Sequence, residues 1–206
     1  MFLNSMQIIH QNNLDIQEIE TALKEGKTIV YPTETCYGLG CDAKNTAAVE
    51  KVFAIKQREE GKSVLVVVSD IDMAKRFVSW TPTLQGLADK FWPGPLTVVV
   101  DVREEHTLAP GVVRDGTVAF RLTSHPLVRE LCEKLNGPIV STSANISGLE
   151  SPYDTRSVIA MFEGKESAPD IIIDGGDLPF TSPSTIVRII DDHVEVLRQG
   201  EIIVES

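Results

Sequence analysis

Short apolar runs of strand length alternate with segments of helical periodicity along most of the chain, and this alternation limits the possible folds more than any other feature. Residues 64–68 are apolar throughout, as expected for a strand that is covered on both faces. Residues 14–23 instead space their apolar side chains as one face of a helix does, and Gly26 follows as a stop signal. The alternation predicts an α/β fold with a twisted sheet and flanking helices.

The same patterns predict the remaining elements. Helices are expected at residues 14–23, 46–55, 70–78, 84–91, 126–135 and 155–162. Strands are expected at residues 28–31, 64–68, 96–102, 118–122, 138–141, 171–173, 185–190 and 194–197, the last two as a hairpin. The late strands have no helices between them, so we expect one open mixed sheet. No linker or repeat divides the chain, and we therefore expect a single domain over residues 10–200 with short flexible termini.

The composition excludes several classes of protein. The 206 residues include 19 Lys and Arg against 30 Asp and Glu, so the net charge is −11 and the surface as a whole does not suit nucleic acid or an anionic membrane. The three cysteines show no paired spacing, which argues against a disulfide framework or a zinc site and fits a reducing compartment. No apolar run approaches the roughly 20 residues of a membrane helix, and the N-terminus has no signal-peptide pattern. We expect a cytoplasmic protein without membrane contact.

Polar segments stand where several predicted strands end. Residues 31–40 and 181–185 combine hydroxyl groups with glycine or proline, and residues 141–148 carry hydroxyl groups and an amide. Such loops can offer short donors to phosphate oxygens, and they can equally form Ser/Thr turns and caps. Lys56 and Arg58 leave the end of a predicted helix, where the helix dipole favours cations and where a phosphate clamp is the alternative interpretation.

Other chemical signatures are absent from the sequence. It contains no glycine-rich nucleotide loop, no metal-ligand spacing and no nucleophile motif, so we assign no metal site. Arg121 interrupts an apolar strand, where it is either paired at an edge or placed to meet a substrate carboxylate. His125 fits a loop or capping role better than that of a base, and nothing in the sequence places a base beside Cys36.

Several short motifs stand in a fixed order along the chain. They are Pro32-Thr33-Glu34-Thr35-x-Tyr37-Gly38-Leu39, Lys56-x-Arg58, Pro93-Gly94-Pro95-Leu96-Thr97, Ser143-x-Asn145-x-Ser147-Gly148 and Ser184-Thr185. Together they resemble the YrdC-like domain of threonylcarbamoyl-AMP synthases, in its short bacterial form, over residues from about 10 to 200. The resemblance implies a YrdC-like fold, in which a twisted open α/β sheet surrounds a large concave cavity.

The resemblance also implies a reaction in which L-threonine, bicarbonate and ATP give threonylcarbamoyl-AMP and pyrophosphate. The product would serve the formation of N6-threonylcarbamoyladenosine at position 37 of tRNA, with separate tRNA-threonylcarbamoyl transferase proteins as downstream partners. Mg²⁺ is implied as the cofactor that accompanies ATP, and direct contact with RNA stays open. Adenylyl transfer needs positioning and charge stabilisation rather than a covalent intermediate, and a site of Lys, Arg, Ser, Thr and Asn can supply both.

Site residues follow from the same resemblance. Lys56 and Arg58 correspond to the catalytic cations at the triphosphate. The ATP contacts correspond to Lys56, Arg58, Lys62, Thr117, Ser143, Asn145, Ser151 and Arg198. The threonine pocket corresponds to Thr35, Arg121, Ser141 and Ser184. The chain departs from the family pattern at Glu59, which replaces a proline, and at Lys62-Ser63 and Val67.

Two other functions stay open at this point. One is that of a paralogue in the same family that acts on another substrate. The other is that of a non-enzymatic factor that binds double-stranded RNA or assists ribosome assembly, which would spread cations and aromatic side chains over an exposed face. Aromatic residues make up only 6% of this chain and its cations gather at predicted loop ends, so the sequence favours the synthase.

Overall fold

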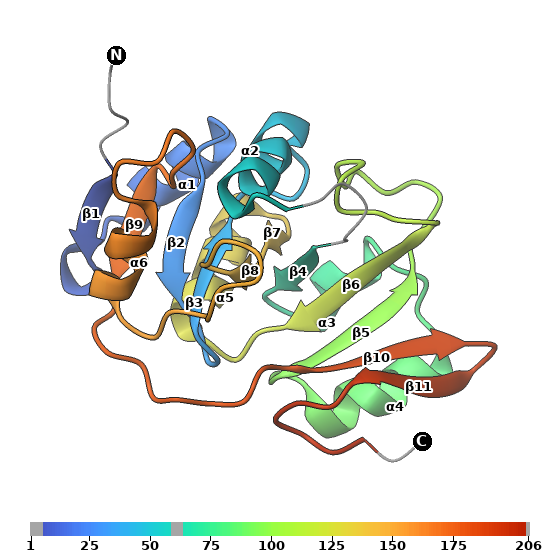
Figure 1. Cartoon of the computed structure of the whole chain (residues 1–206). Helices are drawn as coiled ribbons and strands as arrows, with labels where there is room; N and C mark the ends of the chain where they lie inside the picture. Colours follow the sequence, from blue (N-terminus) through green and yellow to red (C-terminus); the bar gives the residue numbers. More distant parts are fainter. Residues whose placement is uncertain (1–5, 59–63, 205–206) are drawn as a thin grey trace.

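The computed structural model describes residues 6–58 and 64–204. Within these ranges the chain forms a five-stranded and a six-stranded sheet, each with parallel and antiparallel pairs, and helices pack around them (Figure 1). The predicted α/β class and the mixed pairing are confirmed. The strands, however, are divided between two sheets where the sequence suggested one.

The elements lie close to their predicted positions. The helices are α1 (Ile16–Lys24), α2 (Thr46–Lys56), α3 (Ile71–Lys75), α4 (Pro82–Phe91), α5 (Pro126–Leu135) and α6 (Thr155–Phe162), with a 3₁₀ turn η1 (Gln11–Asn13). The strands are β1 (Gln7–His10), β2 (Ile29–Pro32), β3 (Tyr37–Gly40), β4 (Leu65–Val68), β5 (Leu96–Asp101), β6 (Thr117–Leu122), β7 (Ile139–Val140), β8 (Thr142–Ser143), β9 (Ile171–Asp174), β10 (Thr185–Ile190) and β11 (His193–Arg198). The hairpin of β10 and β11 is confirmed, whereas β1, β3 and β8 are additional to the predicted strands.

The two sheets meet at a short extended segment. The strand order is β1-β9-β2-β3-β8 in one sheet and β11-β10-β5-β6-β4-β7 in the other. Ser141 alone separates β7 from β8, so one segment pairs with β4 in the six-stranded sheet and then with β3 in the five-stranded sheet. This junction places residues 141–143 between the sheets. A sequence pattern marks a strand but not its distant partner, which is why the division into two sheets was not predicted.

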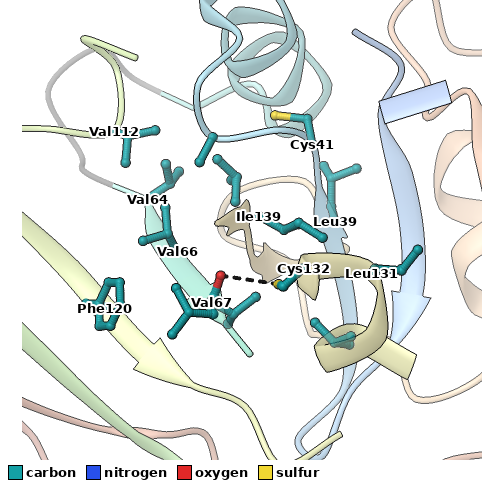
Figure 2. Packing of buried hydrophobic residues seen from close by; sticks show 14 of the residues in the cluster. Leu39, Cys41, Val64, Val66, Val67, Val112, Phe120, Leu131, Cys132 and Ile139 are labelled. Atoms are coloured by element: carbon teal, nitrogen blue, oxygen red, sulfur yellow. Dashed lines mark hydrogen bonds between the residues drawn. The ribbon is translucent and has the colours of Figure 1, made fainter. Parts of the chain in front are cut away.

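A buried apolar core joins α5 and the strands around the junction (Figure 2). Val66 and Ile139 are fully enclosed there, and α5 packs against both β4 and α1. The thiol of Cys132 lies 3.5 Å from the carbonyl oxygen of Val67, to which it donates a hydrogen bond. Burial raises the pKa of both Cys41 and Cys132, so these thiols are packing groups rather than reactive ones.

Residues 37–40 form a strand, although their sequence reads as part of a polar loop. β3 is buried along its length and pairs with β2 and β8. A Cβ atom on Gly40 would lie 2.0 Å from the carbonyl oxygen of Val140, so only glycine lets β7 approach β3 this closely. This glycine therefore serves the packing of two backbones rather than a ligand-binding turn.

Local signals set the bounds of the helices that lead into the site. The side chain of Asn45 caps the first turn of α2, as its sequence predicts. Gln57 takes a left-handed conformation with φ 47° and ends α2, so a sharp turn separates Lys56 from Arg58. His125 stands at the N-cap position of α5, but its side chain makes no capping hydrogen bond.

Candidate active site

A cavity of about 1090 Å³ is lined by strands of both sheets and by the loops that follow them. The predicted site residues that line it are Thr35, Arg58, Thr117, Arg121, Ser141, Ser143, Ser151, Ser184 and Arg198. Lys56 and Asn145 are buried behind its wall, and Lys62 lies outside the described residues. The fold therefore brings the predicted residues of the described chain to one cavity.

Lys56 is buried at the end of α2. Its Nζ donates hydrogen bonds to Ser143 O at 2.6 Å, to Asn145 O at 2.8 Å and to Asn145 Oδ1 at 3.0 Å. An ammonium group has three N–H bonds, so these acceptors occupy all of them. Burial, and then the charge of Arg58, lower the pKa of Lys56 to about 8. Lys56 thus holds the loop after β8 instead of standing free in the cavity.

Asn145 is the centre of that loop. Its Oδ1 also accepts a hydrogen bond from Ser143 Oγ at 2.6 Å, and its Nδ2 donates to the carbonyl oxygen of Leu149. The loop contacts α2 in return, because the backbone N–H of Ser147 donates to Lys56 O at 2.8 Å. Lys56 and the Ser-x-Asn motif therefore form one hydrogen-bonded unit, in which Ser143 lines the cavity and Asn145 is buried next to it.

Arg58 lines the same cavity one residue beyond the left-handed turn at Gln57. It is half-buried, and burial lowers its pKa, yet a guanidinium group stays charged at any physiological pH. Hydroxyl groups of Thr142 and Ser143 line the cavity as well. A guanidinium group together with neutral hydroxyl donors is a combination that suits phosphate oxygens.

Ser184 and Arg198 contact each other on the wall next to β5. Arg198 donates to Ser184 O from Nε at 3.2 Å and from Nη2 at 2.8 Å, and Nη2 also donates to Ser184 Oγ at 3.1 Å. Ser184 Oγ lies 3.1 Å from Thr97 Oγ1. Desolvation, and then the charge of Arg121, lower the pKa of Arg198. Ser184, which the sequence assigned to the threonine pocket, and Arg198, which it assigned to ATP, are therefore hydrogen-bonded to each other in the wall of the cavity.

Arg121 lies on β6 with 4% of its side chain exposed, and it faces a carboxylate. Its Nε is 3.6 Å from Glu34 Oε1, while Glu34 Oε2 accepts a hydrogen bond from Thr123 Oγ1 at 2.9 Å. Glu34 stands in the first sequence motif, but sequence reasoning did not assign it to the site. The available signal was a carboxylate among hydroxyl groups directly after a strand.

Thr35 and Cys36 line the cavity from the loop after β2. Several hydrogen bonds fix this loop, among them that from Thr33 Oγ1 to Cys36 O at 2.7 Å and that from Thr181 Oγ1 to Thr35 O at 2.8 Å. Burial raises the pKa of the Cys36 thiol, which disfavours the thiolate. The loop is therefore a fixed wall, and its cysteine does not suit the role of a nucleophile.

Near Thr117 the cavity is also lined by Arg114 and Asp115, which were not predicted as site residues. Thr117 Oγ1 donates to the carbonyl oxygen of Arg114 at 2.9 Å, and both residues line the cavity. The sequence signal for this part is the long polar connection at residues 103–116. Among the described residues, the carboxylates that line the cavity belong to Asp101, Asp115 and Asp191. No group of three or more His, Cys, Asp or Glu side chains in the described part of the chain is placed to hold a metal ion.

These observations define a class of protein. Strands of two mixed sheets line one cavity that contains both arginine and hydroxyl-bearing residues, as expected for an α/β protein that binds an anionic small molecule. No helix within residues 6–58 or 64–204 has the length and apolar character needed to cross a membrane.

Comparison with known proteins gives the family. The Sua5/YciO/YrdC family model, described as telomere recombination, matches residues 21–200, and the chain belongs to this family. The threonylcarbamoyl-AMP synthase of Bacillus subtilis is 33% identical over 207 residues, which are 100% of this chain and 59% of that protein. The threonylcarbamoyl-AMP synthase of Psychromonas ingrahamii is 33% identical over 168 residues, which are 80% of this chain and 86% of that protein. The resemblance inferred from the motifs is confirmed.

Solved structures agree with the family. Pyrococcus abyssi Sua5, in a complex with L-threonine, matches with a TM-score of 0.80 and 31% identity over 95% of this chain and 57% of that one. Escherichia coli YciO matches with a TM-score of 0.80 and 27% identity over 95% of both chains. The chain therefore spans a little over half of some relatives and nearly the whole of others.

Proposed function

We propose that the protein is a threonylcarbamoyl-AMP synthase that uses L-threonine, bicarbonate and ATP. The observation that carries the proposal is one cavity with two kinds of site residue: Arg58 and Ser143 for a phosphate chain, and Arg121 and Ser184 for an amino acid. Two further findings support it. A relative named threonylcarbamoyl-AMP synthase is matched over most of its own length, and Pyrococcus abyssi Sua5 has been solved with L-threonine.

The proposed chemistry forms one P–O bond and breaks another. The amino group of threonine combines with bicarbonate, loses water and becomes a carbamate. A carbamate oxygen attacks the α-phosphorus of ATP, and the bond from this phosphorus to the bridging oxygen breaks, so pyrophosphate leaves with the electron pair. Negative charge grows on the departing phosphates, where the Arg58 guanidinium would stabilise it. Lys56 contributes by fixing the loop that presents Ser143.

The threonine end of the site combines one cation with hydroxyl groups. Arg121 offers a planar fork of N–H donors, which matches the geometry of a carboxylate. The hydroxyl groups of Thr35, Ser141 and Ser184 line the same cavity and can bond the polar groups of a small amino acid. Thr117, Ser151 and Arg198 remain as the proposed nucleotide contacts among the described residues, and Lys62 is proposed from the sequence alone.

Mg²⁺ fits this site as an ion that arrives with ATP. Proteins usually bind it through one or two carboxylates together with substrate phosphates and water. The oxygen donors present are of that kind, because the carboxylates of Asp101, Asp115 and Asp191 line the cavity, as does Ser143. When bound, the ion would neutralise charge on the phosphate chain.

The product's chemistry indicates the partners. Threonylcarbamoyl-AMP is a mixed anhydride that reacts readily with water, so we propose that a tRNA-threonylcarbamoyl transferase consumes it soon after release, in the cytoplasm. Direct contact with RNA is a separate question. Electrostatic binding of RNA would weaken steeply as salt concentration rises, and a salt titration with a tRNA would reveal it.

Release of pyrophosphate from ATP by the purified protein tests the proposal, with each substrate omitted in turn. A synthase releases pyrophosphate only when L-threonine and bicarbonate are both present. Consumption of ATP that is indifferent to threonine would refute the proposal.

A further inference from the structure

Glu34 is a largely buried carboxylate that faces Nε of Arg121. Only 14% of its side chain is exposed, and it is not among the residues that line the cavity. Thr123, which is fully buried, donates from its hydroxyl group to Glu34 Oε2 at 2.9 Å. The same hydroxyl accepts a hydrogen bond from the backbone N–H of His125 at 3.2 Å, so its direction is fixed. Glu34 is thereby held in one orientation, with Oε1 toward Arg121.

Arg121 is a buried cation with unused donors. No described residue accepts a hydrogen bond from its guanidinium group, although the side chain is 96% buried and lines the cavity. Its Nε and the facing Glu34 Oε1 are both enclosed without a hydrogen-bond partner, at a separation of 3.6 Å. A buried charge is costly unless it is compensated, and here the carboxylate behind the arginine supplies the compensation.

The geometry divides the guanidinium group into two edges. Glu34 faces Nε from behind the wall, and its Oε2 is occupied by Thr123. The edge of the guanidinium group that faces the cavity stays available to a ligand. The charge of Arg121 helps to lower the pKa of Arg198, so the two guanidinium groups repel each other, and the negative charge of Glu34 offsets part of this repulsion.

We propose that Glu34 is a positioning residue that holds Arg121 ready for the carboxylate of the amino-acid substrate, with Thr123 fixing Glu34 in turn. This inference rests on the proposed function, in which Arg121 meets the threonine carboxylate. Glu34 does not touch the substrate. Glu34 balances the charge of Arg121 and keeps the Nε edge of the guanidinium group turned toward itself. The opposite edge of the guanidinium group then faces the cavity as a fork of two donors.

The substitution Glu34→Gln tests the inference, because glutamine keeps the shape and can still accept the hydrogen bond from Thr123. We expect the KM for L-threonine to rise about tenfold, with the KM for ATP and kcat changed less than about threefold. Thr123→Val should raise the KM for L-threonine in the same way but by less. Glu50→Gln, an exposed carboxylate on α2, is the matched control and should change none of these values.

Each outcome decides a different point. If Glu34 merely competed with the substrate for Arg121, Glu34→Gln would bind threonine more tightly, and that result would overturn the inference. An unchanged KM for threonine in both variants would overturn it as well. A purely structural role would lower the thermal midpoint and affect ATP and threonine alike. If the wild-type protein shows no dependence on threonine at all, the proposed function fails before the question of Glu34 arises.

Should Glu34→Gln fail to fold, Thr123→Val and isothermal calorimetry decide the matter. Titration with L-threonine and with L-threoninamide, which lacks the carboxylate charge, measures the preference for a carboxylate. The wild-type protein should prefer threonine strongly, and Thr123→Val should lose part of that preference. Equal preference in the variant and the wild type would refute the role of this pair.

Discussion

Lys56→Met should separate two roles that a buried lysine can have at this site, that of a loop anchor and that of a phosphate ligand. The side chain of methionine fills most of the space of the lysine stem but removes the ammonium donor from Ser143 O, Asn145 O and Asn145 Oδ1. A hydrogen bond to a charged group contributes about 1.5–3 kcal/mol, and relief of the lysine's own desolvation in the variant offsets part of the loss of these bonds. We expect the free energy of unfolding to fall by about 3 kcal/mol.

The assay combines thermal unfolding with pyrophosphate release. For a chain of this size, about 3 kcal/mol corresponds to a fall of roughly 6–12 °C in Tm. Loosening of the loop should also reduce kcat/KM at least tenfold, which is about 1.4 kcal/mol of transition-state stabilisation. Lys51→Met is the matched control, because this exposed lysine of the same helix makes a single hydrogen bond, to Gly26 O at 3.0 Å. A variant that loses activity while its Tm stays within about 2 °C of the wild type would refute the role of loop anchor.

Three further predictions follow from the same geometry. Arg58→Ala should lower kcat/KM for ATP at least tenfold, about 1.4 kcal/mol, and an unchanged kcat/KM would remove Arg58 from the site. Activity should fall as the pH rises above about 8, because Lys56 then loses its proton. Between pH 8 and the ordinary lysine pKa of 10.5 the unfolded chain binds this proton and the native chain does not, so Lys56 makes the free energy of unfolding rise with pH. Urea unfolding at each pH therefore distinguishes loss of the Lys56 charge from loss of the fold. Gly40→Ala should destabilise the protein by about 3 kcal/mol or prevent folding, because the alanine Cβ would meet Val140 O. Gly86→Ala lies inside α4 with no atom near the new Cβ, so urea unfolding should show it to be stabilising by about 0.5–1 kcal/mol.

Elements with strong local signals could be predicted from the sequence, and those that depend on distant partners could not. The helix at Pro126–Leu135 has the predicted bounds because a proline opens it and its apolar side chains keep a helical period. The strand at Tyr37–Gly40 was missed because its glycines resemble a turn, and the reason for Gly40 is a carbonyl group at position 140. The same limit applies to the two sheets, since β7 pairs with β4 and β8 pairs with β3, and both partners lie far away in the sequence.

The candidate site shows the same limit at the level of single side chains. The positions and types of the residues around the site could be predicted, and nine of the predicted site residues line one cavity. The task of Lys56 could not be predicted, because its acceptors lie 87 and 89 positions further along the chain. Glu34 was quoted in a motif, but only its distance to Arg121 Nε shows a function for it.

The division between lysine and arginine around the cavity has a physical reason. Three convergent oxygen atoms surround Lys56, and a compact ammonium group with three donors satisfies them, which a planar guanidinium group does not. Arg58, Arg121 and Arg198 instead line the cavity, where a fork of donors that keeps its charge at physiological pH can meet phosphate or carboxylate. The net charge of −11 is no obstacle, because groups that line a cavity with low-dielectric walls dominate the field inside it. An acidic protein can therefore bind anions, provided that its cations gather where the sheets meet.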